Sequence, residues 1–119
     1  SVPFPYGKWF PMTPITVISA NLAQNLHTLV FLDIQKDKER YMKISEAVDF
    51  LEEQAVHART TIPLYIGIAS AGSDSPVVHA GTAEEIRNFE FGAPLHIMVV
   101  PGELHDIERK YLVRFAGLC

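Results

Sequence analysis

Apolar residues recur along this 119-residue chain with two different periods. Continuous apolar runs, typical of buried strands, occupy residues 28–32, 63–69 and 95–100. The first of these runs should be covered on both faces. A helical period of i, i+3, i+4, i+7 and i+11 runs from Ile44 to Ala55, with acidic residues on the opposite side. Strands and helices therefore alternate along the chain, as they do in α/β domains.

Shorter elements are predicted between these segments. A strand ends near Phe4, and Thr13 followed by Pro14 begins a helix that ends near Asn25. Residues 77–80 form a strand that follows the preceding strand through a turn-forming cluster. Because this connection is short, the two strands should pair antiparallel.

Two further helices are predicted near the end of the chain. Thr82 and Glu85 have the spacing of a capping box, which opens a short helix. The last helix ends before Gly117, and its apolar face consists of Leu104, Ile107, Tyr111, Leu112 and Phe115. The sequence thus predicts an α/β fold with a mixed, roughly five-stranded sheet flanked by about four helices.

Composition narrows the class of protein. The net charge is -4, and the charged residues are interspersed, which argues against nucleic-acid binding because phosphate recognition needs a concentrated positive field. The single cysteine, Cys119, permits no internal disulfide and favours a reducing cytoplasm. No apolar stretch approaches the roughly 20 residues that span a bilayer. The five histidines lack the close spacing of metal ligands, so we expect no metal site.

Two titratable residues are candidates for a ligand cleft at the end of the sheet. Asp33 follows the first buried strand, and His96 begins the last one. Each also has a structural interpretation, since such a carboxylate often caps a loop and such a histidine often hydrogen-bonds nearby backbone. Gly72 and Ser73 would let a ligand approach the backbone or would form a tight turn. No nucleophile elbow, phosphate loop or pair of dinucleotide-binding glycines is present.

Several short segments resemble one family, the diphthine synthases of the tetrapyrrole-methylase-like superfamily. The most informative are residues 27–34 and 91–96, whereas Leu-His-Thr-Leu at residues 26–29 and Pro-Gly-Glu-Leu-His at residues 101–105 argue against a tetrapyrrole methyltransferase. The resemblance covers essentially the whole chain but only the second domain of the family. Its segments are residues 21–34, 40–42, 69–73, 80–82, 91–96, 101–105 and 108–112.

The resemblance implies that residues 1–119 are the C-terminal domain of an S-adenosylmethionine-dependent methyltransferase, and that the N-terminal cofactor-binding domain is absent from this chain. The parent enzyme would methylate the amino group of the modified histidine of elongation factor 2 in diphthamide biosynthesis, with S-adenosylhomocysteine as product. By matching motif, Leu32, Ala71 and His96 would line the cofactor pocket between the two domains. A binding role is expected for His96 rather than that of a general base, and no catalytic residue is assigned.

Methyl transfer from a sulfonium to an amine needs alignment, exclusion of water and an unprotonated nucleophile. One wall of a cleft cannot align both reactants, so we expect this chain alone to bind cofactor weakly or not at all and to have no turnover. The partners expected from the resemblance are elongation factor 2, the chain's own N-terminal domain and a second copy in a homodimer. Nucleic acid and membrane are not among them.

Two residues depart from the family pattern. Ser70 stands where arginine is common, so any charge contact of that arginine is lost. Lys43 replaces the Ser or Thr that usually caps the following helix, so Ser45 or a frayed first turn should take its place.

Two other functions remain open on the sequence. One is a cobalamin-pathway or other tetrapyrrole methyltransferase with the same two-domain architecture. The other is a stand-alone dimeric ligand-binding module that performs no chemistry. An in-frame upstream domain with a glycine-rich loop would exclude the module.

Overall fold

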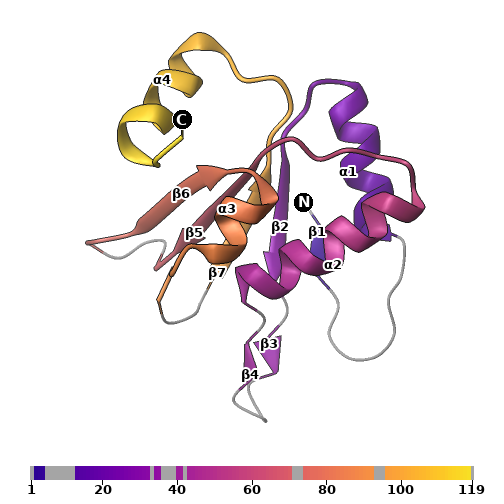
Figure 1. Cartoon of the computed structure of the whole chain (residues 1–119), viewed down its shortest axis with the longest axis horizontal. Coiled ribbons are helices and arrows are strands. Elements are labelled where there is room, and N and C mark those ends of the chain that lie inside the picture. The colour runs from indigo at the N-terminus through magenta and orange to yellow at the C-terminus, as the bar shows by residue number, and fades with distance from the viewer. Residues whose placement is uncertain are drawn as a thin grey trace.

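The structure, a computed structural model, describes residues 2–4, 13–32, 34–35, 40–41, 43–70, 74–92 and 96–118. These residues form one five-stranded sheet, a two-stranded ribbon and four helices (Figure 1). The strands are β1 (Val2–Phe4), β2 (Thr28–Leu32), β3 (Ile34–Gln35), β4 (Arg40–Tyr41), β5 (Tyr65–Ala69), β6 (Val77–Gly81) and β7 (His96–Val100), and the helices are α1 (Thr13–Ala23), α2 (Ile44–His57), α3 (Ala83–Asn88) and α4 (Asp106–Phe115).

The sheet is mixed, in the order β1-β2-β7-β5-β6. Strand β1 runs parallel to β2, and the other neighbours are antiparallel, including the β5–β6 pair joined by the short connection. The predicted mixed, five-stranded sheet with flanking helices is therefore confirmed. The β3–β4 ribbon was not predicted, because strands of two residues each carry no periodic signal.

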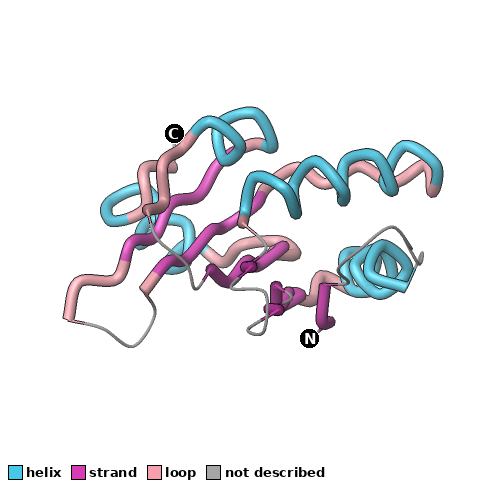
Figure 2. The backbone as a smooth tube through the Cα atoms, turned by 90° about the horizontal axis from the view of Figure 1, so that it is seen from below, coloured by secondary structure: helices cyan, strands magenta, loops and turns pink. Residues whose placement is uncertain are grey.

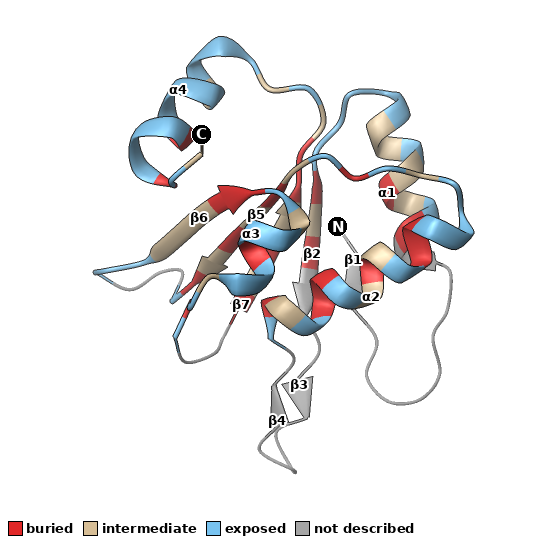
Figure 3. Ribbon diagram, viewed as in Figure 1, coloured by how far each residue is buried: buried red, intermediate tan, exposed pale blue. Residues whose placement is uncertain are grey.

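One face of the sheet is covered by α1, α2 and α3, which share a single core with it. Figure 2 shows the strands as one layer with α2 along one side. Buried and exposed residues alternate along α2 (Figure 3), as its sequence period predicts. Ile44, Val48 and Leu51 are at most 1% exposed. Burial of each such side chain stabilises the folded state by about 1.5–3 kcal/mol compared with leaving it in water.

The same core contains one buried tyrosine with a satisfied hydroxyl. Tyr65 Oη donates to Glu52 Oε2 at 2.7 Å, across the interface between β5 and α2. Burial raises the pKa of Tyr65 above its usual range, and the hydrogen bond to Glu52 adds to the shift. The hydroxyl therefore stays protonated and serves as a fixed donor to the helix.

The other face of the sheet is covered only in part. Leu112 of α4 and Ala116 pack there against Ala80 of β6. Leu29 of β2 is only half-buried on this side, so the expectation that β2 is covered on both faces holds for one face alone. The apolar face predicted for α4 likewise splits, since only Leu112 is buried within it. Ile107, Tyr111 and Phe115 are 82%, 57% and 60% exposed.

His27 connects α4 to the end of the sheet through two hydrogen bonds. The Gly102 N–H donates to His27 Nδ1 at 2.9 Å, and His27 Nε2 donates to Glu108 Oε2 at 3.0 Å. The other carboxylate oxygen of Glu108 accepts the His105 N–H at 2.9 Å. That backbone bond, followed by the one from His27, lowers the pKa of Glu108. Three segments of the family resemblance, residues 21–34, 101–105 and 108–112, thus meet at one corner of the fold.

We predict that Gly102→Ala destabilises the protein by about 1–3 kcal/mol, the usual cost of overpacking. A Cβ at this position would lie 2.6 Å from the carbonyl carbon of Asn25, which is backbone and cannot rotate away. Urea denaturation measures the change. Val56→Ala on the exposed side of α2 is the control and should stay within about 0.5 kcal/mol of the unsubstituted chain. Equal stability of the two variants would contradict the close approach.

Candidate functional site

The sheet register brings two of the three cofactor-contact candidates to one end of the sheet. Ala69 of β5 pairs with His96 of β7, and Phe31 of β2 pairs with Ile97. Leu32, the next residue of β2, therefore lies beside His96. Ala71 follows Ala69 by two positions but lies outside the described residues, as do Asp33, Gly72 and Ser73.

The His96 side chain is buried and has both ring nitrogens engaged. Nδ1 accepts the Ile44 N–H at 3.3 Å, and Nε2 lies 3.0 Å from the Gly92 carbonyl oxygen. Because a carbonyl can only accept, the proton is on Nε2 and the imidazole is the neutral Nε2–H tautomer. The structural interpretation of this histidine, a hydrogen bond to nearby backbone, is thus realised.

A row of aromatic rings backs this end of the sheet. Phe91 is tilted against His96, with ring centroids 6.0 Å apart, and receives Phe89 edge-on at 4.6 Å. Phe89 in turn stacks on His79 at 3.9 Å. Phe91 can occupy this position because Gly67 has no side chain. A Cβ on residue 67 would lie 2.4 Å from Phe91 Cζ. The aromatic row therefore ends beside the His96 ring.

The start of α2 is capped without a Ser or Thr. Glu46 Oε1 accepts the Lys43 N–H at 3.1 Å, and His96 accepts the N–H of Ile44, the first residue of the helix. The expectation that Ser45 or a frayed turn replaces the usual cap is therefore wrong. The position of Glu46, three residues after the cap, is a sequence signal for half of this arrangement. His96 is 52 residues away, and no local pattern could have indicated it.

The β6–α3 junction confirms the predicted capping box. The Glu85 N–H donates to Thr82 Oγ1 at 3.4 Å, and Glu85 Oε1 accepts the Thr82 N–H at 3.0 Å. The backbone bond from Thr82, with the side-chain bond second, lowers the pKa of Glu85.

At the end of β5, Ser70 is exposed and has a φ of 56°, a left-handed conformation that costs a non-glycine residue free energy.

A small polar cavity of about 170 Å³ adjoins His96. Ligand pockets are usually about 300–1,000 Å³ and enclose most of the ligand. The described residues at this end therefore form a wall rather than a closed pocket. The polar residues that line the cavity are Lys43, Ser45, Arg87, Asn88 and Glu90, of which Arg87 pairs with Asp49.

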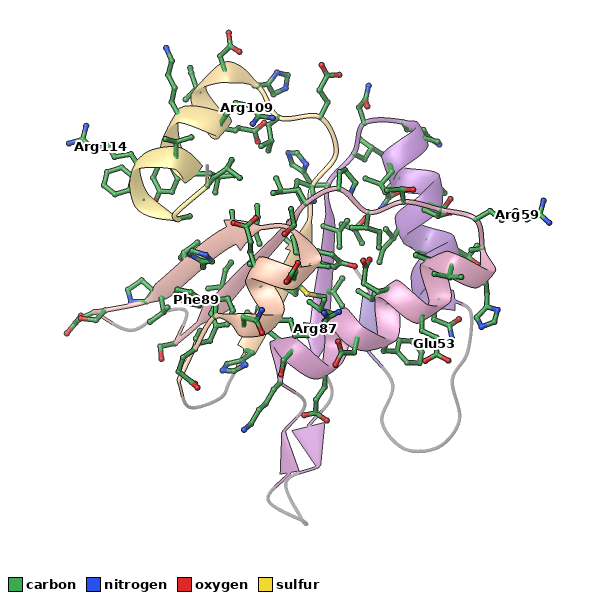
Figure 4. The ribbon with its side chains drawn as sticks, viewed as in Figure 1. Glu53, Arg59, Arg87, Phe89, Arg109 and Arg114 are labelled. Atoms are coloured by element: carbon green, nitrogen blue, oxygen red, sulfur yellow. The ribbon has the colours of Figure 1, made fainter. Side chains whose placement is uncertain are left out.

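Two larger hollows lie towards the opposite end of the sheet. An apolar groove of about 380 Å³ separates α4 from the sheet and includes Ile66, Val99 and Tyr111. A cavity of about 690 Å³ is lined by Arg109 among others. In Figure 4, Arg109 lies on the inner side of α4, whereas Arg114 points away from the molecule. Neither hollow includes His96.

Within the described part of the chain, no group of three or more His, Cys, Asp or Glu side chains could hold a metal ion. No helix in it is long and apolar enough to cross a membrane.

Comparison with known proteins identifies the relatives of this chain. A diphthine synthase of Methanocorpusculum labreanum is 76% identical over 119 residues, which are 100% of this chain and 47% of that protein. A diphthine synthase of Methanosphaerula palustris is 58% identical over 118 residues, or 99% of this chain and 46% of that protein. The chain belongs to the diphthine synthase family. No protein-family model matches it.

The fold agrees with this assignment. A crystal structure of diphthine synthase matches 99% of this chain with a TM-score of 0.85 at 35% identity, and the match covers 45% of that chain. The chain spans about half the length of the curated diphthine synthases it matches.

We predict that Gly67→Ala and Phe91→Leu are energetically coupled. The added methyl displaces the Phe91 ring and should cost about 1–3 kcal/mol, whereas beside a smaller leucine it should cost less. Urea denaturation of both single variants and the double variant gives the coupling. Strictly additive changes in the free energy of unfolding would contradict the contact between the two residues.

Proposed function

We propose that this chain forms one wall of the cofactor cleft of an S-adenosylmethionine-dependent methyltransferase in diphthamide biosynthesis. The substrate we infer is the modified histidine of elongation factor 2, whose amino group takes the methyl. The observation that carries the proposal is 76% identity to a diphthine synthase over the whole chain. The relatives reported above are named diphthine synthases, which favours this substrate over a tetrapyrrole.

We infer that the His96 end of the sheet holds the nucleoside of the cofactor through backbone and apolar contacts. Both ring nitrogens of His96 are hydrogen-bonded to backbone groups, so its side chain offers the cofactor no free hydrogen-bond donor or acceptor. The cofactor, when bound, supplies a methyl group on a sulfonium. Leu32, Ala71 and the backbone of His96 would hold and orient it, and no residue of this chain is assigned the removal of the amine proton.

The cofactor cleft needs a second wall. We propose that a domain outside this chain supplies it, with the remaining contacts to the cofactor, in a cytoplasmic protein. The small volume beside His96 supports this, because it is below the usual size of a ligand pocket. Alignment of sulfonium and amine would then depend on both walls.

The first experiment is calorimetric titration of S-adenosylhomocysteine into this chain and into the full-length parent. We expect saturable binding by the parent, and binding at least about tenfold weaker by the chain, because affinity rests on contacts from both walls. Equal affinity would show that this chain alone forms the site. No binding by either protein would overturn the cofactor assignment.

The homodimer is also a proposal, and the exposed stripe Ile107, Tyr111 and Phe115 of α4 is the surface we assign to it. These side chains recur every four residues and continue into the apolar groove, a combination typical of interaction surfaces. Helix α4 has acidic residues in its first turn and Arg114 in its last. Antiparallel packing of two copies would place each acidic turn beside the basic end of the other.

We predict that Ile107→Glu shifts the chain from dimer to monomer, because the charge would be buried without a partner in the apolar contact. Sedimentation velocity measures the change. Val56→Glu is the matched control: Val56 is 76% exposed on α2, away from the stripe, and its substitution should leave the dimer intact. A chain that is monomeric at all concentrations, or an unchanged dimer in Ile107→Glu, would refute this surface.

A further inference from the structure

We propose that the His96 imidazole is a positioning residue, which sets the backbone of the cofactor wall and takes no part in proton transfer. The inference rests on the proposed function for its link to the cofactor. The hydrogen bonds from which it is argued do not depend on that function. They join the first residue of β7 to the start of α2, 52 residues away in sequence, and to Gly92, four residues before it.

The bond to Nδ1 satisfies a backbone donor at a helix terminus. The Ile44 N–H belongs to the first turn of α2, where the helix offers no acceptor of its own. Glu46 is bonded to the neighbouring Lys43 N–H, so the cap is shared between two side chains. His96 thereby fixes where α2 begins relative to β7.

The requirement at this position is specific to a neutral imidazole. One side of the ring must accept a backbone N–H, and the other must donate to a carbonyl. A neutral histidine and the side-chain amides carry the donor and the acceptor on two separate nitrogen or oxygen atoms, whereas a hydroxyl carries both on one oxygen. An asparagine approximates the position of Nδ1 and a glutamine that of Nε2, so each keeps one of the two bonds.

The same arrangement rules the side chain out as a base in this conformation. The lone pair of Nδ1 already accepts the Ile44 N–H, and Nε2 already carries a proton. The ring also packs beside Phe91, whose position depends on Gly67. Freeing His96 to accept a proton from an amine would require both bonds and this packing to break.

Nuclear magnetic resonance tests the bonds directly. In 15N-labelled chain, we expect the His96 nitrogens to show the Nε2–H tautomer, and the Ile44 amide resonance to shift strongly in His96→Gln but less in His96→Asn. His57→Phe, which changes an exposed histidine at the far end of α2, is the control and should leave the Ile44 amide unchanged. A proton on Nδ1, or an Ile44 amide resonance that stays unchanged in the His96 variants, would overturn the two proposed hydrogen bonds.

Cofactor affinity and turnover test the positioning role in the full-length parent. We expect His96→Phe to weaken S-adenosylhomocysteine binding about tenfold or more, with His96→Asn and His96→Gln in between because each retains one bond. At saturating cofactor, the kcat of the two amide variants should stay within about threefold of the parent value, because no proton transfer is lost.

Three outcomes would contradict the role. Parent-like affinity in His96→Phe would exclude positioning. A kcat lowered more than about a hundredfold in both amide variants, with affinity unchanged, would point instead to a base. Absence of binding by the unsubstituted parent would overturn the proposed function and the cofactor part of this inference, while the Ile44 amide shift would still decide the hydrogen bonds.

Discussion

The structure depends on the insertion of β7 between β2 and β5. This strand is the last of the sheet in sequence but lies at its centre, where Met98 pairs with Val30 on one side and with Gly67 on the other. The sheet is incomplete until residues 96–100 pair with both neighbouring strands. These pairings join residues far apart in the sequence. Such pairings form slowly, because the entropy of loop closure is lost before the pairing contributes any stability. The two ends of β7 then organise the two ends of the molecule.

A histidine holds each end of β7 by the same chemistry. At its start, His96 accepts a backbone N–H through Nδ1 and donates through Nε2 to the Gly92 carbonyl. Beyond its end, His27 accepts the Gly102 N–H through Nδ1 and donates through Nε2 to a carboxylate. Two of the segments that carry the family resemblance therefore build a corner of the fold. Likeness to an enzyme family in these segments reports architecture as much as chemistry.

The sequence predicts the contacts between residues that are close together in the chain. It does not predict the contacts between residues that are far apart. The buried stripe of α2 and the Thr82 capping box depend on residues within a few positions of each other, and both are confirmed. The bond from His96 to Ile44 spans 52 residues, and no periodicity encodes it. The exposure of Ile107 was equally hidden, because an apolar helical period does not say which apolar residues the sheet covers.

The two faces of the sheet divide the proposed tasks. The face under α1, α2 and α3 is dry, and its core includes Phe91, which supports His96. Because His96 is held against such a core, cofactor binding would not have to order this side chain. The stripe on α4 lies on the opposite face and shares no residue with that core. Disrupting association there need not disturb the wall, whereas any change at Gly67 or Phe91 reaches it through direct contact.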